Sequence, residues 1–201
     1  MKKSLGNIMI GLGLVILILV GYGMMEHKRQ QNELIQSFTA IKTEAATNDS
    51  IDKTIGQAMN SPKQETREND VVGILKIPEI ELEAPVLKGA TTDNLNKALG
   101  MINGLDDPGT LNGSTAIAGH QSHVFGQFFN RLNELKIGDR FELETSTDTL
   151  NFKVFNIQVV KPENVEILMR QEGISLLSLV TCYPERSNQF RLVVQAKKVE
   201  D

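Results

Sequence analysis

The chain contains a single cysteine, Cys182, at the point where an apolar run ends and a proline-containing loop begins. The run before it is Ser178-Leu179-Val180-Thr181, and a second run, Phe190-Arg191-Leu192-Val193-Val194, follows the loop. A cysteine at a strand end can present its sulfur to a cleft while the strand stays fixed in a core. The placement therefore fits a nucleophile. Taken alone, a lone cysteine fits a small buried hydrophobe better, so other residues must decide.

A thiol becomes a good nucleophile as a thiolate, which needs a nearby cation or base such as histidine. Beyond residue 70 the candidates are His120 and His123, and His120 follows a predicted strand and a glycine, at a strand end. Arg191 follows Cys182 on the next strand and faces away from Phe190 and Leu192. Its guanidinium could donate to a developing oxyanion. The alternative is a structural ion pair with Glu185.

The same residues could belong to a metal site. His120, His123 and Cys182 could supply three ligands, but no convincing fourth ligand completes the set. Asp106 and Asp107 could contact calcium, although two adjacent carboxylates without further acidic neighbours make a weak site. We therefore predict no metal centre and no cofactor.

Length and composition limit the remaining possibilities. With 201 residues the chain can form one domain with a proper core and appendages. The net charge of -4 gives no basic footprint for nucleic acid. One cysteine excludes an intramolecular disulfide, and the absence of tryptophan predicts a mainly aliphatic core.

The N-terminus contains a candidate membrane anchor. Residues 8–25 include no charged side chain and are about long enough to cross the hydrocarbon core of a bilayer. The run ends at Met24-Met25-Glu26 without a small-residue cleavage site, which predicts an uncleaved signal anchor rather than a buried helix. Basic residues flank both ends, so the positive-inside rule leaves the orientation open.

The chain divides into three predicted parts. Residues 1–25 form a short tip and the anchor, residues 26–70 a polar stalk that could contain short helices, and residues 71–201 the folded domain. In the stalk, Leu34, Phe38 and Ile41 have the i, i+4, i+7 spacing of an amphipathic helix.

Short apolar runs separated by glycine and proline indicate a mainly β domain. A phase switch between Leu150 and Val159 predicts a bulge within one strand. Short helices are expected over 92–99 and 124–135. Seven or eight short strands argue for a closed or nearly closed β-barrel; the clearest are 71–77, 114–118, 140–144, 150–159, 176–181 and 190–199.

These motifs resemble the sortase family, in particular its class A housekeeping type. The family's T-L-x-T-C strand end, A-G-H motif and following arginine correspond to Ser178-Leu179-Val180-Thr181-Cys182, Ala118-Gly119-His120 and Phe190-Arg191. The resemblance covers about residues 73–199, with framework motifs at Gly73-Ile74-Leu75-Lys76-Ile77-Pro78, Ala84-Pro85-Val86, Leu135-Lys136-Ile137-Gly138-Asp139 and Lys161-Pro162.

The resemblance implies an eight-stranded sortase-type barrel and a membrane-anchored cysteine transpeptidase outside a Gram-positive cell. Cys182 would attack the Thr carbonyl of an L-P-x-T-G signal on a secreted protein, and a cell-wall precursor amine of the lipid II type would release the thioacyl enzyme. His120 would act as general acid and base and Arg191 would steady the oxyanion. By the same analogy the protein is a single-pass type II membrane protein with an extracellular catalytic domain.

Two further expectations come from the resemblance. A small apolar pocket would receive the signal's Leu and Pro, with contacts from Thr181, Val180, Ala90, Ala118, Val160, Pro162, Val165, Ile167 and Val193. Some class A members bind calcium, but Gly100 and Asn103 lie where acids would be expected and Arg170 lies in the later loop. We therefore predict calcium independence.

Two other functions stay open at this stage. One is a sortase specialised for a variant signal, and the other is a non-catalytic, membrane-tethered barrel that binds peptides. The joint presence of His120, Cys182 and Arg191 favours an enzyme, because a binding module needs none of the three.

Overall fold

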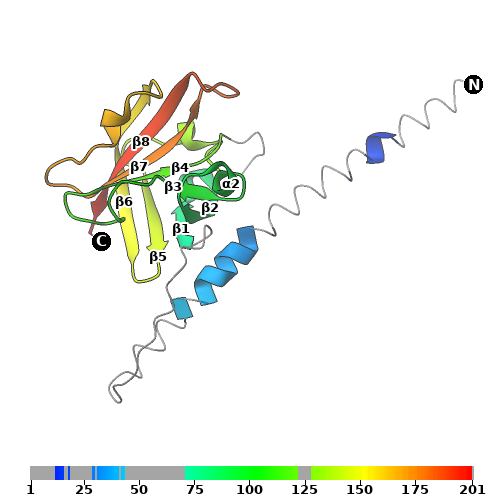
Figure 1. Cartoon of the computed structure of the whole chain (residues 1–201), viewed down its shortest axis with the longest axis horizontal. Coiled ribbons are helices and arrows are strands. Elements are labelled where there is room, and N and C mark those ends of the chain that lie inside the picture. Colours follow the sequence, from blue (N-terminus) through cyan, green and yellow to red (C-terminus); the bar gives the residue numbers. More distant parts are fainter. Residues whose placement is uncertain are drawn as a thin grey trace, which may run out of the picture.

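The computed structural model describes residues 12–15, 18, 29, 31–40, 42–43, 71–121 and 128–200. The described residues between Val71 and Val199 form a closed barrel of eight strands with a few short helices (Figure 1). This confirms the predicted mainly β, eight-stranded barrel. The strands are β1 Val71–Ile77, β2 Leu82–Lys88, β3 Leu99–Met101, β4 Ser114–Ala118, β5 Arg140–Thr145, β6 Thr149–Val160, β7 Leu176–Tyr183 and β8 Phe190–Val199. The helices are α2 Thr92–Leu95 and the 3-10 turns η1 Pro78–Ile80, η2 Leu132–Glu134 and η3 Val165–Leu168.

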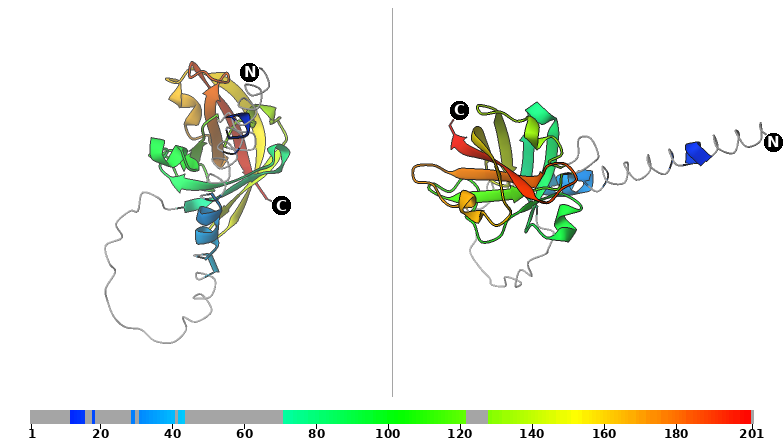
Figure 2. Two further views of the ribbon diagram at one scale, coloured as in Figure 1. Left: turned by 90° about the vertical axis from the view of Figure 1, so that its right-hand side faces the viewer. Right: turned by 90° about the horizontal axis from the view of Figure 1, so that it is seen from above.

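The strand order around the barrel is β1-β2-β3-β4-β7-β8-β6-β5, and β5 closes the barrel on β1. Figure 2 shows the barrel from two further sides. Strand β7 lies between β4, to which it is parallel, and β8, to which it is antiparallel. Parallel neighbours end at the same edge of a sheet. The residues that follow β4 and those that end β7 therefore meet at one rim of the barrel.

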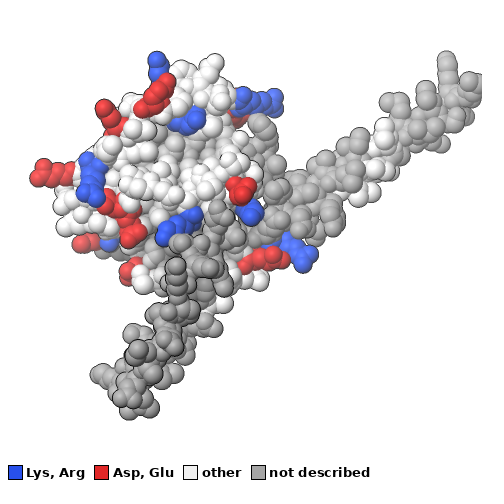
Figure 3. All heavy atoms as spheres, in the orientation of Figure 1, with Lys and Arg blue, Asp and Glu red and all other residues white. Residues whose placement is uncertain are grey.

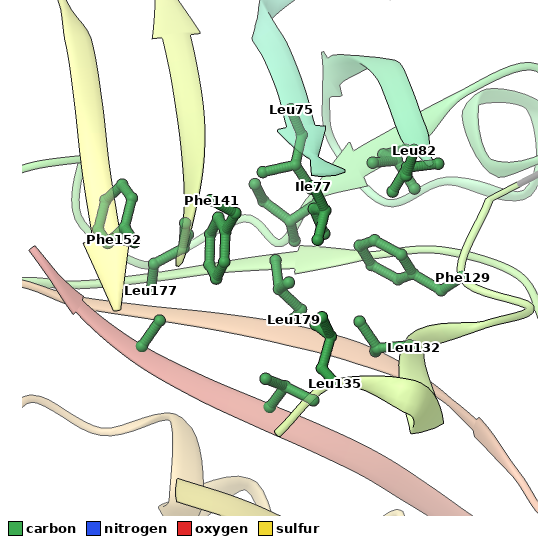
Figure 4. Packing of buried hydrophobic residues seen from close by; sticks show 14 of the residues in the cluster. Leu75, Ile77, Leu82, Phe129, Leu132, Leu135, Phe141, Phe152, Leu177 and Leu179 are labelled. Carbon is green, nitrogen blue, oxygen red and sulfur yellow. The ribbon is translucent and has the colours of Figure 1, made fainter. Parts of the chain in front are cut away.

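The core of the barrel is aliphatic with a few phenylalanines, as the composition predicts. Alternate residues of each strand point inward, among them Leu75 on β1 and Leu177 and Leu179 on β7, all fully buried (Figure 4). Phe141 and Phe152 are register partners on β5 and β6, and their rings stack with centroids 5.7 Å apart. This packing fixes the strands whose ends carry the polar residues.

Strand β6 contains the predicted bulge. The register to β8 shifts between Val154 and Asn156, which reverses the side-chain alternation along the strand. Asn156 pairs with Gln195 and donates from Nδ2 to its Oε1 at 2.7 Å. The bulge therefore brings a polar side chain to the outer face of β8.

The described residues of the two predicted helices contain less helix than the spacing indicates. The Thr91 hydroxyl caps α2, which ends at Leu95 because Leu99–Met101 form β3 instead of a last helical turn. Of residues 124–135, those up to 127 lie outside the described part, and the remainder contains only η2. Phe128 has φ 52°, in the left-handed region, which cannot continue a right-handed helix. The apolar spacing there reflects core packing, since Phe128, Phe129 and Leu132 are buried.

Residues 31–40 of the N-terminal part are helical. Phe38 is only 2% exposed, and Lys42 Nζ lies 2.5 Å from Glu144 Oε1 on β5. This helix therefore packs against other parts of the chain. Among the described residues, no helix has the length and apolar character that crossing a membrane requires. Within 8–25 the structure describes 12–15 and 18, so the anchor and the three-part division stay predictions.

Charged side chains are mixed in sign over the face of the barrel shown in Figure 3. Acidic and basic groups alternate around a central area that is free of charged side chains. This face offers no basic surface for nucleic acid, in agreement with the net charge of -4.

Candidate active site

His120 and Cys182 stand at matching positions beyond two parallel strands. Ala118 of β4 is the register partner of Val180 of β7, and the backbone N–H of Gly119 donates to the Val180 carbonyl at 3.1 Å. His120 follows Ala118 by two residues, and Cys182 follows Val180 by two. The parallel pairing therefore sets the histidine beside the cysteine.

Thr181 adds a second link between these two segments. Its hydroxyl donates to the Gly119 carbonyl at 2.8 Å, and the side chain is 3% exposed. Because strand side chains alternate, Thr181 faces the barrel interior while Cys182 faces outward. The bond fixes Thr181 against the segment that carries His120. A contact of Thr181 with substrate stays a prediction.

Gln121 provides a third link that sequence reasoning missed. With its amide nitrogen turned toward the available acceptors, Gln121 donates to the carbonyls of Cys182 at 3.0 Å and Pro184 at 3.3 Å. These bonds connect the residue after His120 with the end of β7. The only signal in the sequence is adjacency to His120, because glutamine alone indicates no chemistry.

A surface pocket of about 420 Å³ joins the two reactive side chains. His120, Gln121 and Cys182 line it together with Arg186, Ser187 and Asn188 of the β7–β8 loop. The His120 side chain is exposed, and Cys182 is half-buried with a free thiol. A thiol and an imidazole are thus open to the same solvent-accessible space.

Arg191 lies across from Cys182 on the neighbouring strand. The two residues are antiparallel register partners, so their side chains leave the same face of the sheet. Arg191 Nη1 donates to the carbonyls of Asn188 at 3.0 Å and Phe190 at 2.9 Å. Within the described residues Nη2 and Nε have no such bond, and no ion pair joins Arg191 to Glu185.

Four of the residues predicted for an apolar pocket share the outer face that carries Cys182. Ala118, Val180 and Val193 are register neighbours across β4, β7 and β8. Val160 is the register partner of Arg191 on β6. Val193 is only 2% exposed although it faces outward, so another segment covers this surface.

The segment that contains η3 lies over the same face. Gln195 Nε2 donates to the Ile167 carbonyl at 2.7 Å, and Ser114 Oγ donates to the Leu168 carbonyl at 2.6 Å. Ile167 is half-buried, whereas Val165 is 56% exposed. These bonds place Ile167, and with it Val165 two residues earlier in the same segment, at the edge of the apolar surface.

Ala90 and Pro162 are less closely tied to this surface. Gly100 of β3 is the register partner of Ala118. A Cβ atom at Gly100 would lie 2.7 Å from Ala90 Cα, so the backbone of Ala90 packs directly against β3. Pro162 is exposed just after β6. None of the predicted apolar residues lines the polar pocket around Cys182, so the structure separates an apolar face from the reactive pocket.

Asp106, one of the two carboxylates considered as calcium ligands, forms an ion pair with Arg170. Arg170 donates to Asp106 from Nη2 to Oδ1 at 2.5 Å and from Nε to Oδ2 at 2.7 Å, and the Ser114 N–H donates to Oδ2 at 2.8 Å. The Arg170 bond, followed by the Ser114 bond, lowers the pKa of Asp106 below its ordinary value.

No group of three or more His, Cys, Asp or Glu residues in the described part of the chain is arranged to hold a metal ion. The alternative with His123 as a ligand falls on a residue outside that part. Metal and calcium independence therefore stay predictions.

A thiol, an imidazole and a guanidinium at adjoining strand ends are the parts of a cysteine-dependent acyl-transfer enzyme. Residues 75–199 match the family model described as the sortase domain, which spans more than half of the chain. The chain belongs to the sortase family of cysteine transpeptidases that act in cell-wall protein anchoring.

Similar proteins carry the names of several sortase classes. The chain is 26% identical to sortase D of Bacillus subtilis over 184 residues, which are 92% of this chain and 90% of that protein. It is 27% identical to sortase A of Staphylococcus aureus over 195 residues, 90% of this chain and 89% of that protein. The crystal structure of sortase C-1 from Actinomyces oris superposes with a TM-score of 0.63 at 28% identity, covering 80% of this chain and 99% of that one. The similarity defines the family and leaves the class open.

Proposed function

We propose that this protein is a class A-type sortase that cleaves an L-P-x-T-G-like sorting signal between Thr and Gly. It then joins the secreted protein to an amine of a cell-wall precursor of the lipid II type. The observation that carries this proposal is that His120 and Cys182 line the same pocket. Arg191 is the register partner of Cys182 on the neighbouring strand β8.

In the first half-reaction, Cys182 Sγ attacks the carbonyl carbon of the signal's Thr, and a C–S bond forms. Arg191 Nη2 and Nε donate to the oxyanion, while Nη1 stays bonded to the Asn188 and Phe190 carbonyls. The C–N bond to Gly then breaks, and His120 gives its proton to the leaving amine. The products are a thioacyl enzyme and a peptide that begins with Gly.

In the second half-reaction, the acceptor amine attacks the thioacyl carbon and His120 takes its proton. The C–S bond breaks, the new amide leaves, and Cys182 is released as a thiolate for the next cycle. One residue serves as acid and then as base because its ring lies open to the same pocket as the thiol.

The outer face beside Cys182 supports recognition of the signal's Leu and Pro. Ala118, Val180 and Val193 form an apolar row across three strands, and the η3 segment borders it. The two apolar residues of the signal would contact Ala118 and Val180, the half-buried members of this row, with the scissile bond directed toward Cys182.

The nucleophile assignment is tested by Cys182→Ala, with Cys182→Ser as the matched variant that keeps size and polarity. We expect both to fold normally and to lose cleavage of an L-P-x-T-G peptide and transfer to an added amine by more than about a thousandfold. His120→Ala should behave alike. Wild-type-level cleavage by Cys182→Ala would refute the assignment.

A sortase for a variant signal is the second candidate. The observation that favours it is the nearly equal identity to proteins named sortase D, A and C, at 26%, 27% and 28%. A peptide panel that varies the first two signal positions separates the candidates, since a class A-type enzyme should prefer Leu-Pro. A non-catalytic peptide-binding barrel would bind the panel but give no thiol adduct with a thiol-reactive substrate analogue.

We also propose that residues 8–25 anchor the protein with the barrel outside the cell, and that calcium plays no part. The uncharged run supports the anchor, and the Arg170–Asp106 ion pair supports calcium independence. Activity of the full-length chain in a nonionic detergent should be the same with a calcium chelator and with added calcium. A calcium-dependent rate would refute the second proposal.

A further inference from the structure

A second pocket, of about 740 Å³, lies at the other end of the barrel strands from Cys182. Leu176, at the start of β7, is the register partner of Lys197, and Cys182 follows six residues later on the same strand. At about 3.3 Å per strand residue, the two regions lie on the order of 20 Å apart. The residues that line it are Gly109, Leu111, Arg140, Lys153, Gly173, Ile174, Ser175, Lys197, Lys198, Val199 and Glu200.

The lining of this pocket is strongly basic in a chain whose net charge is -4. Four of its side chains are cations (Arg140, Lys153, Lys197 and Lys198) and one is an anion (Glu200), so the local balance is 4 - 1 = +3. The sign of this region is therefore opposite to that of the whole protein.

Three of the cations form a row across adjacent strands. Arg140 on β5 is the register partner of Lys153 on β6, and Lys153 is the register partner of Lys197 on β8. Register partners direct their side chains to the same face, and neighbouring strands lie about 4.8 Å apart. The row therefore spans about 10 Å.

The described residues leave the charges of this row without an ion-pair partner. None of the four cations forms an ion pair with a described residue, whereas Lys42, Lys76 and Arg170 each pair with a carboxylate. Like charges directly opposite one another on a sheet destabilise it. An external anion would remove this repulsion.

We propose that this pocket binds a linear polyol phosphate polymer and not a nucleic acid, because its lining holds no aromatic side chain on which a base could stack. A phosphate offers oxygens in several directions, so it can accept the bidentate fork of Arg140 and the point charges of lysines together. A row of three cations over about 10 Å is matched by successive phosphates along a chain rather than by one phosphate. This proposal does not rest on the transpeptidase reaction, because the pocket and Cys182 lie at different ends of the barrel.

The test is calorimetric titration of the full-length chain, in a nonionic detergent at low ionic strength, with a synthetic glycerol phosphate oligomer. Glycerol 1-phosphate and poly-L-glutamate serve as comparison ligands. Lys153→Gln/Lys197→Gln removes the centre and one end of the row. Arg140→Gln/Lys197→Gln removes its two exposed ends and is used if the half-buried Lys153 is needed for folding. Lys88→Gln/Lys97→Gln, with the same loss of charge at exposed sites on other elements, is the matched control.

We expect the oligomer to bind wild type and the control alike, and either pocket variant at least about tenfold more weakly. Added salt should weaken the wild-type complex most. Three results would overturn the proposal: equal loss in the control, binding of poly-L-glutamate as tight as that of the oligomer, or equally tight binding of glycerol 1-phosphate, which would indicate a single phosphate such as a lipid headgroup.

Discussion

At the scale of single residues, three hydrogen-bonded links hold the histidine segment against the cysteine strand. The Gly119 N–H, the Thr181 hydroxyl and the Gln121 amide connect residues 119–121 with residues 180–184. The sequence identified the reactive side chains by type, but these links depend on which backbone carbonyls lie nearby. Gln121 could not be found from its residue type, because its role exists only once β4 and β7 are paired.

Gln121→Ala should lower the kcat of peptide cleavage about tenfold, leave KM close to wild type and lower the melting temperature by a few degrees. The variant loses two bonds that fix the relative position of His120 and Cys182, each with a net value of about 1 kcal/mol, although neither bond is part of the reaction. Steady-state kinetics and thermal unfolding measure the three quantities.

Gln121→Glu is the informative companion variant. An ionised carboxylate has no hydrogen to donate and would face the Cys182 and Pro184 carbonyls, so it should be at least as impaired as Gln121→Ala. Full activity of Gln121→Glu, or a loss expressed only in KM, would argue against a positioning role.

At the scale of elements, the β6–β7 segment is held onto the barrel by side chains from three places. Ser114 and Gln195 bind its carbonyls at Leu168 and Ile167, and Asp106 pairs with Arg170. Because η3 borders the apolar row beside Cys182, these bonds set the shape of the proposed signal-binding face. The Arg170–Asp106 pair is the contact of this group that responds to pH.

Arg170→Gln should lower the urea midpoint at pH 7, and the difference from wild type should shrink in acid. The pKa of Asp106 is lowered in the folded chain, chiefly by its bond to Arg170. The pair therefore stabilises the fold above the ordinary carboxyl pKa of about 3.9, and this stability is lost as the pH falls through the lower folded pKa. Urea unfolding across this range measures the difference.

Lys136→Gln is the control for this experiment, because it removes an exposed cation that forms no ion pair with a described residue. Its midpoint should follow wild type at every pH. A difference between Arg170→Gln and wild type that stays constant into acid would mean that the ion pair is not what stabilises this segment.

At the scale of the whole molecule, local patterns predicted the elements better than their arrangement. Alternation and turn residues identified most strands and the bulge in β6, because both signals lie within a few residues. The three-residue strand β3 was missed, since its pairing with β2 and β4 is not encoded in its own short sequence. The helix expected over 124–135 is contradicted in its described part, residues 128–135, because core packing and helical spacing give the same apolar pattern.

The site depends on that arrangement. His120, Cys182 and Arg191 could be selected from their residue types and positions at strand ends, and from the family resemblance. The parallel β4–β7 pair brings His120 to Cys182 from a segment far earlier in the chain. The antiparallel β7–β8 pair places Arg191 across from Cys182. The basic row of β5, β6 and β8 was not foreseen for the same reason, since its members are far apart in sequence.

The central claim is that Cys182 carries the acyl group of the cleaved signal. Mass spectrometry of the full-length chain, quenched in acid after mixing with an L-P-x-T-G peptide and no amine, measures this. We predict that Cys182 gains the signal fragment ending at Thr, as an acyl group. Peptide cleavage with Cys182 unmodified, or a fragment that extends past Thr, would show that the account of the site is wrong.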